Sequence, residues 1–167
     1  TLEPEAMDAI ALERFRAHFG DPTSGALRLI ASQVRARLRE MVSEWLRPLA
    51  ARIPIAVTGL EQSLEATWEG WRLAGRLDAL LSRGGRPWIL DWKTGGSTAW
   101  ILGKHADLVS ADRSTWRKGL ASAQLPMYLL LHGANGGAHP LGADAAYVML
   151  GRSRMDAECE VPLFADR

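Results

Sequence analysis

The chain has 167 residues, 47% of them hydrophobic, and a formal net charge of +1. This length suits one domain, or one domain with a small attachment, and it allows a sizeable core. The near-zero charge neither favours nor excludes a polyanionic partner. The single cysteine, Cys159, excludes an internal disulfide, an iron–sulfur cluster held by four cysteines and any structural site of several thiolates from this chain alone.

Two further observations concern membrane-spanning and targeting segments. No stretch approaches the roughly 20 apolar residues needed to cross a bilayer, and no basic-then-apolar signal segment opens the chain. With one cysteine, we expect a reducing, cytoplasmic compartment. The chain begins at Thr1 and its first methionine is Met7, so we expect a domain excised from a larger protein.

The first elements that the sequence predicts are helices. Residues 4–19 have acids early and a glycine, Gly20, placed to end a helix. A turn follows, with an N-cap at Thr23 or Ser24. Apolar residues spaced by three or four then predict a longer helix that reaches about Pro48.

The pattern then changes to pieces of alternation broken by glycine and proline. We predict three antiparallel strands, over residues 60–68, 71–82 and 87–93. The sequence "SRGGRP" joins the last two as a hairpin. Residues 94–118 are predicted to be irregular, and a loop of this length in a compact domain is usually functional or mobile.

The C-terminal third alternates between helix and strand. Residues 119–132 look helical despite a proline, residues 142–152 predict a strand, and "CEVPLF" predicts a short last strand. This order favours an α/β fold with a mixed sheet flanked by helices. We expect one domain, with a helical N-terminal part over residues 1–52 and a core over residues 59–152.

The stretch "WILDWKTGG" carries the chemistry. Asp91 and Lys93 are two residues apart on a predicted strand and therefore share a face. Residues paired across a hairpin sum to a near-constant, and a turn centred on residues 84–85 sets Asp78 opposite Asp91. Two carboxylates that close require a cation or a raised pKa.

Such a pair suits a hard divalent cation. Carboxylate oxygens are preferred by Mg²⁺ or Mn²⁺, and the backbone carbonyl of Trp92 can add a further oxygen ligand. A cation held between Asp78 and Asp91 can polarise a phosphoryl oxygen and lower the pKa of bound water. Lys93 lies beside it, placed to stabilise developing negative charge. The combination predicts metal-dependent phosphodiester hydrolysis.

The residues "GRLD", "DWK" thirteen residues further on, and later "AQLPMY" resemble the PD-(D/E)XK nuclease superfamily, and within it the RecB-like branch that includes AddB. The resemblance covers roughly residues 59–150 and implies a restriction-endonuclease-like fold. It implies that Asp78 and Asp91 bind metal and that Lys93 is catalytic. It also implies that Gln124 and Tyr128 line the active site, where they orient the substrate.

The sequence departs from this family at one place. RecB-like nucleases carry a metal-ligand histidine on an early helix, where this chain has Leu29 and Ile30. His18 can substitute, or water can fill the position. Glu61 and Glu65 on the first predicted strand are further candidate acids near the metal.

A cluster in the long predicted loop suits contact with a nucleic acid strand, because aromatic stacking combined with cations holds single strands. Its residues are Arg113, Trp116, Arg117 and Lys118. A flexible surface loop is the alternative interpretation.

The leading hypothesis for the whole chain is a Mg²⁺- or Mn²⁺-dependent DNA nuclease, exonucleolytic, from a DNA repair or recombination protein of the helicase–nuclease type. Other domains or subunits of such a complex are the expected partners. The alternatives are a catalytically degenerate module that grips DNA or a partner subunit, and a purely structural interaction domain.

Overall fold

The computed structural model describes residues 4–98, 103, 107–137 and 139–164. It divides into two compact units, one made of residues 1–51 and 154–158 and the other of residues 52–153 and 159–167. Within the described ranges, no helix has the length and apolar character required to span a membrane.

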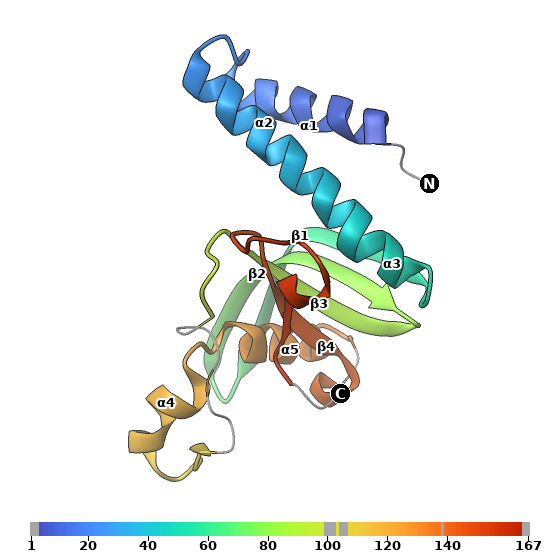
Figure 1. The fold of residues 1–167 in the computed structure, drawn as a ribbon. Helices are drawn as coiled ribbons and strands as arrows, with labels where there is room; N and C mark the ends of the chain where they lie inside the picture. Colours follow the sequence, from blue (N-terminus) through green and yellow to red (C-terminus); the bar gives the residue numbers. More distant parts are fainter. Residues whose placement is uncertain (1–3, 99–102, 104–106, 138, 165–167) are drawn as a thin grey trace. The chain divides into compact units, whose positions relative to one another are not determined.

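The first unit is helical, as the sequence predicts (Figure 1). Ser24 is the N-cap of its second helix, and its side chain accepts a hydrogen bond of 3.2 Å from the Leu27 amide. The second helix continues through a π-helical turn, so the predicted end near Pro48 is close to the observed end at Ala50. The elements are α1 (Pro4–Phe19), α2 (Gly25–Glu40), η1 (Met41–Leu46) and α3 (Arg47–Ala50).

A buried acid joins the first two helices of this unit. Asp8 on α1 is 8% exposed, and its carboxylate accepts hydrogen bonds from Arg35 at 2.7 Å and from Arg39 at 2.9 Å, both on α2. A nearly buried carboxylate needs such partners to stay charged. These two arginines are therefore engaged in holding the helices together.

The second unit contains a five-stranded sheet with the order β1-β2-β3-β4-β5. Only the β3–β4 pair is parallel, and the other neighbours are antiparallel. The predicted mixed sheet is thus confirmed, although its first strand begins five residues earlier than predicted. The strands are β1 (Ile55–Trp68), β2 (Trp71–Arg83), β3 (Arg86–Lys93), β4 (Asp144–Met149) and β5 (Glu160–Pro162).

The β2–β3 hairpin has the register that the sequence predicts. Gly84 and Gly85 have φ values of 61° and 84°, the left-handed conformation that a two-residue type I′ turn requires at both central positions. Arg83 lies opposite Arg86, and the pairs continue to Ala79 opposite Leu90. Asp78 and Asp91 are the next residues of the two strands beyond this last pair.

Helix α5 (Gln124–Ala134) packs on the sheet and connects the parallel strands β3 and β4 (Figure 1). Its buried residues Leu125, Leu129 and Leu131 join the hydrophobic core with Leu77 and Ile89 of the sheet. A crossover helix of this kind is how two adjacent parallel strands are usually connected.

The helix predicted over residues 119–132 is two helices in the structure. Residues 116–120 form α4 (Trp116–Leu120), and α5 begins only at Gln124. Pro126 explains the late start, because a proline without an N–H is tolerated in the first turn and not in the interior of a helix. Short 3₁₀ helices complete the fold: η3 (Arg113–Thr115), η4 (Pro140–Gly142) and η5 (Ala157–Cys159).

The segment predicted to be irregular, residues 94–118, therefore includes η3 and the start of α4. Asp112 caps η3, and its side chain accepts a hydrogen bond of 2.9 Å from the Ser114 amide. Local capping of this type is not visible to a search for hydrophobic periodicity, because the helix is too short to repeat. Residues 99–102 and 104–106 lie outside the described ranges.

Candidate active site

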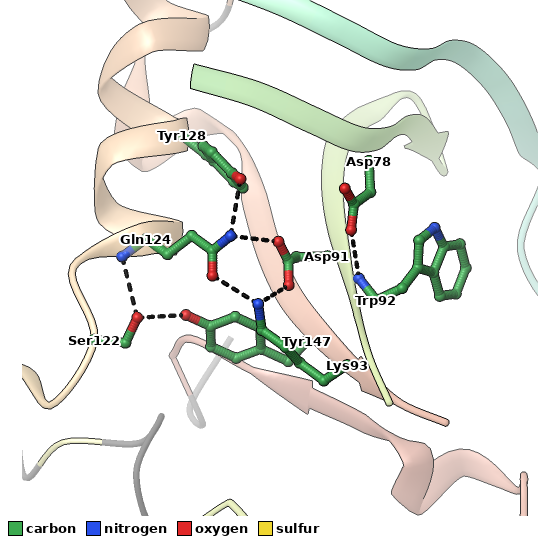
Figure 2. A network of polar contacts seen from close by, with 8 residues as sticks. All are labelled: Asp78, Asp91, Trp92, Lys93, Ser122, Gln124, Tyr128 and Tyr147. Carbon is green, nitrogen blue, oxygen red and sulfur yellow. Dashed lines mark hydrogen bonds and ion pairs between the residues drawn. The ribbon is translucent and has the colours of Figure 1, made fainter. Parts of the chain in front are cut away.

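Asp91 is the most deeply buried acid of the described residues, with 2% of its surface exposed. It lies near the end of β3, and Figure 2 shows its carboxylate turned toward the first turn of α5. Oδ1 accepts a hydrogen bond of 2.7 Å from Gln124 Nε2. Oδ2 lies 2.5 Å from Lys93 Nζ as an ion pair, but accepts no well-directed hydrogen bond from the described residues.

Lys93 extends from the same strand face as Asp91, as expected for residues two apart. Its ammonium group also donates a hydrogen bond of 2.7 Å to Gln124 Oε1. It lies 5.1 Å from the centre of the Tyr147 ring, a cation–π contact. The side chain is 17% exposed, so the ammonium is largely withdrawn from solvent.

Gln124 connects the helix to the sheet. It is the first residue of α5, and Tyr128 is one turn further on the same helical face. Gln124 Nε2 donates to the Tyr128 hydroxyl at 2.9 Å as well as to Asp91 (Figure 2). With Oε1 facing Lys93, the orientation of the Gln124 amide is set by its charged neighbours.

Asp78 lies on β2, beside this network rather than within it. Its Oδ2 accepts a hydrogen bond of 2.8 Å from the backbone amide of Trp92, at the end of β3. In Figure 2 the Asp78 carboxylate faces the Trp92 amide, whereas the Asp91 carboxylate faces Gln124. The two acids are therefore neighbours across the strand pair, each held by different partners.

The electrostatics of the pair follow from burial. Withdrawal from water raises the pKa of Asp91 above its ordinary value of 3.8; Lys93 opposes the rise, and the negative charge of Asp78 adds to it. Burial also raises the pKa of the Tyr128 hydroxyl, which keeps it protonated. A charged group held at such a cost in a strand end is typical of functional sites.

The donor set fits a hard divalent cation. The described residues contain no group of three or more His, Cys, Asp or Glu side chains that could hold a metal. Mg²⁺, however, is commonly bound through one or two carboxylates, with water and substrate phosphate oxygens completing its shell. Asp78 and Asp91 supply two carboxylates, and the buried Oδ2 of Asp91 has hydrogen-bonding capacity to spare. A site of this kind does not require a histidine.

The accessory acids proposed from the sequence have arginine partners. Glu61 and Glu65 lie on β1, and both are exposed. Glu61 accepts a hydrogen bond of 2.6 Å from Arg76 Nε, and Glu65 one of 2.7 Å from Arg72. Their place near a metal stays a prediction.

His18 belongs to α1 in the helical unit, and its Nδ1 lies 2.9 Å from the Arg14 carbonyl, so it donates there as the N–H tautomer. Leu29 and Ile30, which stand where the resemblance to RecB-like nucleases predicts a histidine, are exposed on α2 at 59% and 47%. A role for His18 as a replacement ligand stays a prediction.

The basic and aromatic residues considered for DNA contact are all exposed. Trp116 donates through Nε1 to the Val109 carbonyl at 3.2 Å, and the Arg113 guanidinium lies 5.7 Å from the centre of its ring. Lys118 forms an ion pair of 3.3 Å with Asp107. Contact with nucleic acid stays a prediction for all four.

Two residues of the network were not singled out from the sequence. Tyr147 lies on β4 directly opposite Asp91 in the parallel ladder, and its hydroxyl donates to Ser122 Oγ at 3.0 Å. Ser122 Oγ in turn accepts the backbone amide of Gln124 at 3.3 Å. The only sequence signal was a tyrosine in an apolar strand and a serine before a helix, both of which are common in cores and caps.

Glycines after β3 allow a close backbone approach near Lys93. A Cβ atom on Gly96 would lie 2.8 Å from the Gly151 carbonyl oxygen, and a Cβ on Gly151 would lie 2.4 Å from the Thr94 carbonyl oxygen. No side chain fits between these segments. The glycines after β3 and after β4 therefore allow the backbones of the two segments that follow these strands to lie directly against each other.

Comparison with known proteins agrees with this geometry. No curated protein matches the chain at a significant level. One family model matches residues 1–163, nearly the whole chain. The five-stranded mixed sheet with flanking helices is consistent with the restriction-endonuclease-like fold. By this match the chain belongs to the PD-(D/E)XK nuclease superfamily.

Proposed function

We propose that the protein hydrolyses phosphodiester bonds in DNA with the help of Mg²⁺ or Mn²⁺. The observation that carries the proposal is Asp91, an almost fully buried carboxylate between Lys93 and Gln124, with Asp78 on the neighbouring strand. Membership of a nuclease superfamily supports the reaction class. A structural ion pair would not need a second acid and an amide at the same strand end.

The roles follow from the chemistry of each group. Asp78 and Asp91 would hold the cation, with the carbonyl of Trp92 as a further ligand. When bound, the cation would neutralise phosphate charge and acidify water. Lys93 holds a positive charge where negative charge develops during phosphoryl attack. The side chains of Gln124 and Tyr128 hydrogen-bond to each other beside Asp91, where they would orient the substrate.

Lys93 and a bound cation compete for one atom. The ammonium lies 2.5 Å from Asp91 Oδ2, which accepts no well-directed hydrogen bond from the described part of the chain. A cation held by this oxygen would weaken the Asp91–Lys93 ion pair, and the ammonium would keep its hydrogen bond to Gln124 Oε1 and could donate to the substrate. Binding of a cation by the acids and release of Lys93 for catalysis would then be coupled.

The finer parts of the proposal rest on the likeness to RecB-like nucleases. They are exonucleolytic action, a place in a repair or recombination protein of the helicase–nuclease type, other domains or subunits of that complex as partners, and a cytoplasmic location. The exposed cluster of Arg113, Trp116, Arg117 and Lys118 is the proposed contact with the DNA strand. Its exposure and its Arg113–Trp116 contact support this assignment.

The alternative is a module that binds DNA without cutting it. Two observations favour it: Leu29 and Ile30 replace the histidine of RecB-like enzymes, and the described residues hold no group of three metal-ligating side chains. Under this alternative, Asp91 and Lys93 form a relict ion pair, and the protein binds DNA with no dependence on Asp78.

The test measures cleavage of labelled linear DNA by the purified chain with Mg²⁺, with Mn²⁺ and with a chelator. Wild type should cut only with a cation, and Asp78→Asn, Asp91→Asn and Lys93→Met should each lose roughly a hundredfold or more in rate. Asp21→Asn is the matched control, because Asp21 is an exposed acid of the helical unit and its change should leave cleavage intact.

Folding of each variant is checked by circular dichroism. If folded wild type leaves single- and double-stranded DNA uncut under all cation conditions, the hydrolase proposal fails. Calorimetry then decides on the binding module: saturable Mn²⁺ binding that depends on Asp78 and Asp91 argues against it, and DNA binding with no such site supports it.

A further inference from the structure

Tyr147 and Ser122 complete a closed circuit of contacts that includes the ammonium of Lys93. Lys93 Nζ donates to Gln124 Oε1 at 2.7 Å, and the backbone amide of Gln124 donates to Ser122 Oγ at 3.3 Å. The contacts continue to the Tyr147 hydroxyl at 3.0 Å and return through the Tyr147 ring to Lys93 at 5.1 Å (Figure 2). This circuit of contacts joins β3, β4 and the start of α5.

We propose that Tyr147 is a positioning residue for the reaction, whose ring holds the Lys93 ammonium in place, and that Ser122 fixes this ring relative to Gln124. This inference rests on the proposed function of Lys93. It concerns residues that the polar motif of the family does not include, and it follows from contacts of the described side chains.

The position of Tyr147 leaves it little freedom. It is 1% exposed and directly opposite Asp91 in the parallel β3–β4 ladder. Because parallel neighbours present their side chains on the same face of the sheet, its ring lies beside the acid–lysine pair. A buried tyrosine hydroxyl needs a partner, and Ser122 provides one.

The need for such a support arises from the competition at Asp91. A cation on Asp91 would weaken the ion pair with Lys93, because two positive charges would then lie close together. The ammonium would still have two contacts, Gln124 Oε1 and the Tyr147 ring face. The negative face of an aromatic ring attracts a cation without supplying an oxygen that could itself bind the metal. A carboxylate at this place would hold Lys93 and also capture the cation.

The first measurement requires no catalysis. The chain contains three lysines, and Lys118, with a 69% exposed side chain, serves as the internal reference. Pulse acylation of the metal-free protein with an N-hydroxysuccinimide ester, followed by mass spectrometry, gives the reactivity of Lys93 relative to Lys118. We expect Tyr147→Leu to raise this ratio about tenfold and Tyr147→Phe to leave it within about twofold.

Fluorinated phenylalanines at position 147 distinguish a weakened cation–π contact from misfolding. They keep the shape of the Tyr147→Phe ring but progressively weaken the negative charge of its face. The Lys93 acylation ratio should rise with each added fluorine while the thermal melting curve stays constant. A merely structural role of the ring would not produce this graded response.

The second measurement concerns cleavage. Tyr147→Leu should lower kcat about tenfold with little change in KM, and Tyr147→Phe should restore most of it. Ser122→Ala and Tyr147→Phe remove the same hydrogen bond, so each should lower kcat by about twofold and the double variant should be no worse.

Two results would overturn the proposal. One is a Lys93-to-Lys118 acylation ratio that changes neither with Tyr147→Leu nor with fluorination. The other is Tyr147→Phe reducing kcat as much as Tyr147→Leu, because the hydroxyl rather than the ring would then be required. If the protein cuts no DNA at all, the proposed function fails, whereas the acylation result still decides whether Tyr147 holds Lys93.

Discussion

Replacing Lys93 by methionine should destabilise the protein in a way that depends on pH. Methionine keeps most of the apolar stem of lysine and removes the charge. Asp91, with a 3% exposed side chain, then loses the partner that opposes the rise of its pKa, and burial and Asp78 both raise that pKa further. The variant therefore carries a buried carboxylate with no cation beside it.

The magnitude follows from the burial of the two groups. Removing one partner of a buried ion pair costs about 3–5 kcal/mol of unfolding free energy. Lys93 is 17% exposed, and Asp91 keeps its hydrogen bond from Gln124, so the lower end, about 3 kcal/mol at neutral pH, applies. For a chain of this length that is a decrease of roughly 6–12 °C in melting temperature.

The sign of the pH dependence is fixed by the direction of the shift. A carboxyl whose pKa is raised in the folded state binds its proton more tightly there. Its contribution to stability is present below the ordinary value of 3.8 and is lost as the pH rises through the folded pKa. Since Lys93→Met raises this pKa further, the loss of stability relative to wild type should be small in acid and largest at neutral pH.

The assay is urea unfolding of both proteins in chelator, at several pH values from 5 to 8, followed by tryptophan fluorescence. The Asp91→Asn/Lys93→Met double variant is the control, because it removes the buried charge itself. It should recover most of the lost stability and show none of the added pH dependence. A loss that is equal at every pH, or a double variant as unstable as the single one, would refute this account of Asp91.

Two further predictions concern glycines that allow close approach to the site. Gly151→Ala places a Cβ 2.4 Å from the Thr94 carbonyl oxygen, so it should displace the segment after Lys93 and lower DNA cleavage at least tenfold; unchanged cleavage would contradict the contact. Gly75→Ala places a Cβ 2.9 Å from Leu131 Cδ1 and 3.3 Å from Tyr128 Cε1. It should lower the urea unfolding free energy by about 1–3 kcal/mol, whereas Gly70→Ala, in an open turn with positive φ, tests strain without this crowding.

The hairpin that carries both acids could be predicted from the sequence because its determinants are local. Gly84 and Gly85 specify the turn, and the turn specifies which residues face each other. The alternating burial of β2 follows from its own residues. Gln124 and Tyr128 came instead from likeness to a family, since a glutamine and a tyrosine four apart occur on many helices.

The contacts of Tyr147 and Ser122 could not be predicted from local sequence patterns. Tyr147 meets Lys93 only because β4 pairs in parallel with β3 at a register where Tyr147 faces Asp91. No tight turn links these two strands, because α4 and α5 lie between them in the chain. Likewise, the late start of α5 at Gln124 brings Ser122 within reach of Tyr147, whereas a helix from residue 119 would have placed Ser122 inside it.

The two acids and the residues that contact them come from different parts of the chain. Asp78 and Asp91 are adjacent through one hairpin, so their mutual repulsion is present as soon as β2 and β3 pair. Two residues that surround Asp91, Gln124 and Tyr147, come from α5 and β4, more than thirty residues later in the chain. Burial of Asp91 requires these elements, because α5 and β4 supply residues that pack around it. The cost of burying Asp91 therefore falls on the docking of α5 onto the sheet, and a cation that binds the acids should strengthen that docking specifically. Hydrogen exchange of the α5 amides with and without Mn²⁺ measures this coupling: protection should rise in α5 and not in the β2–β3 hairpin, and an equal rise in both would place the penalty elsewhere.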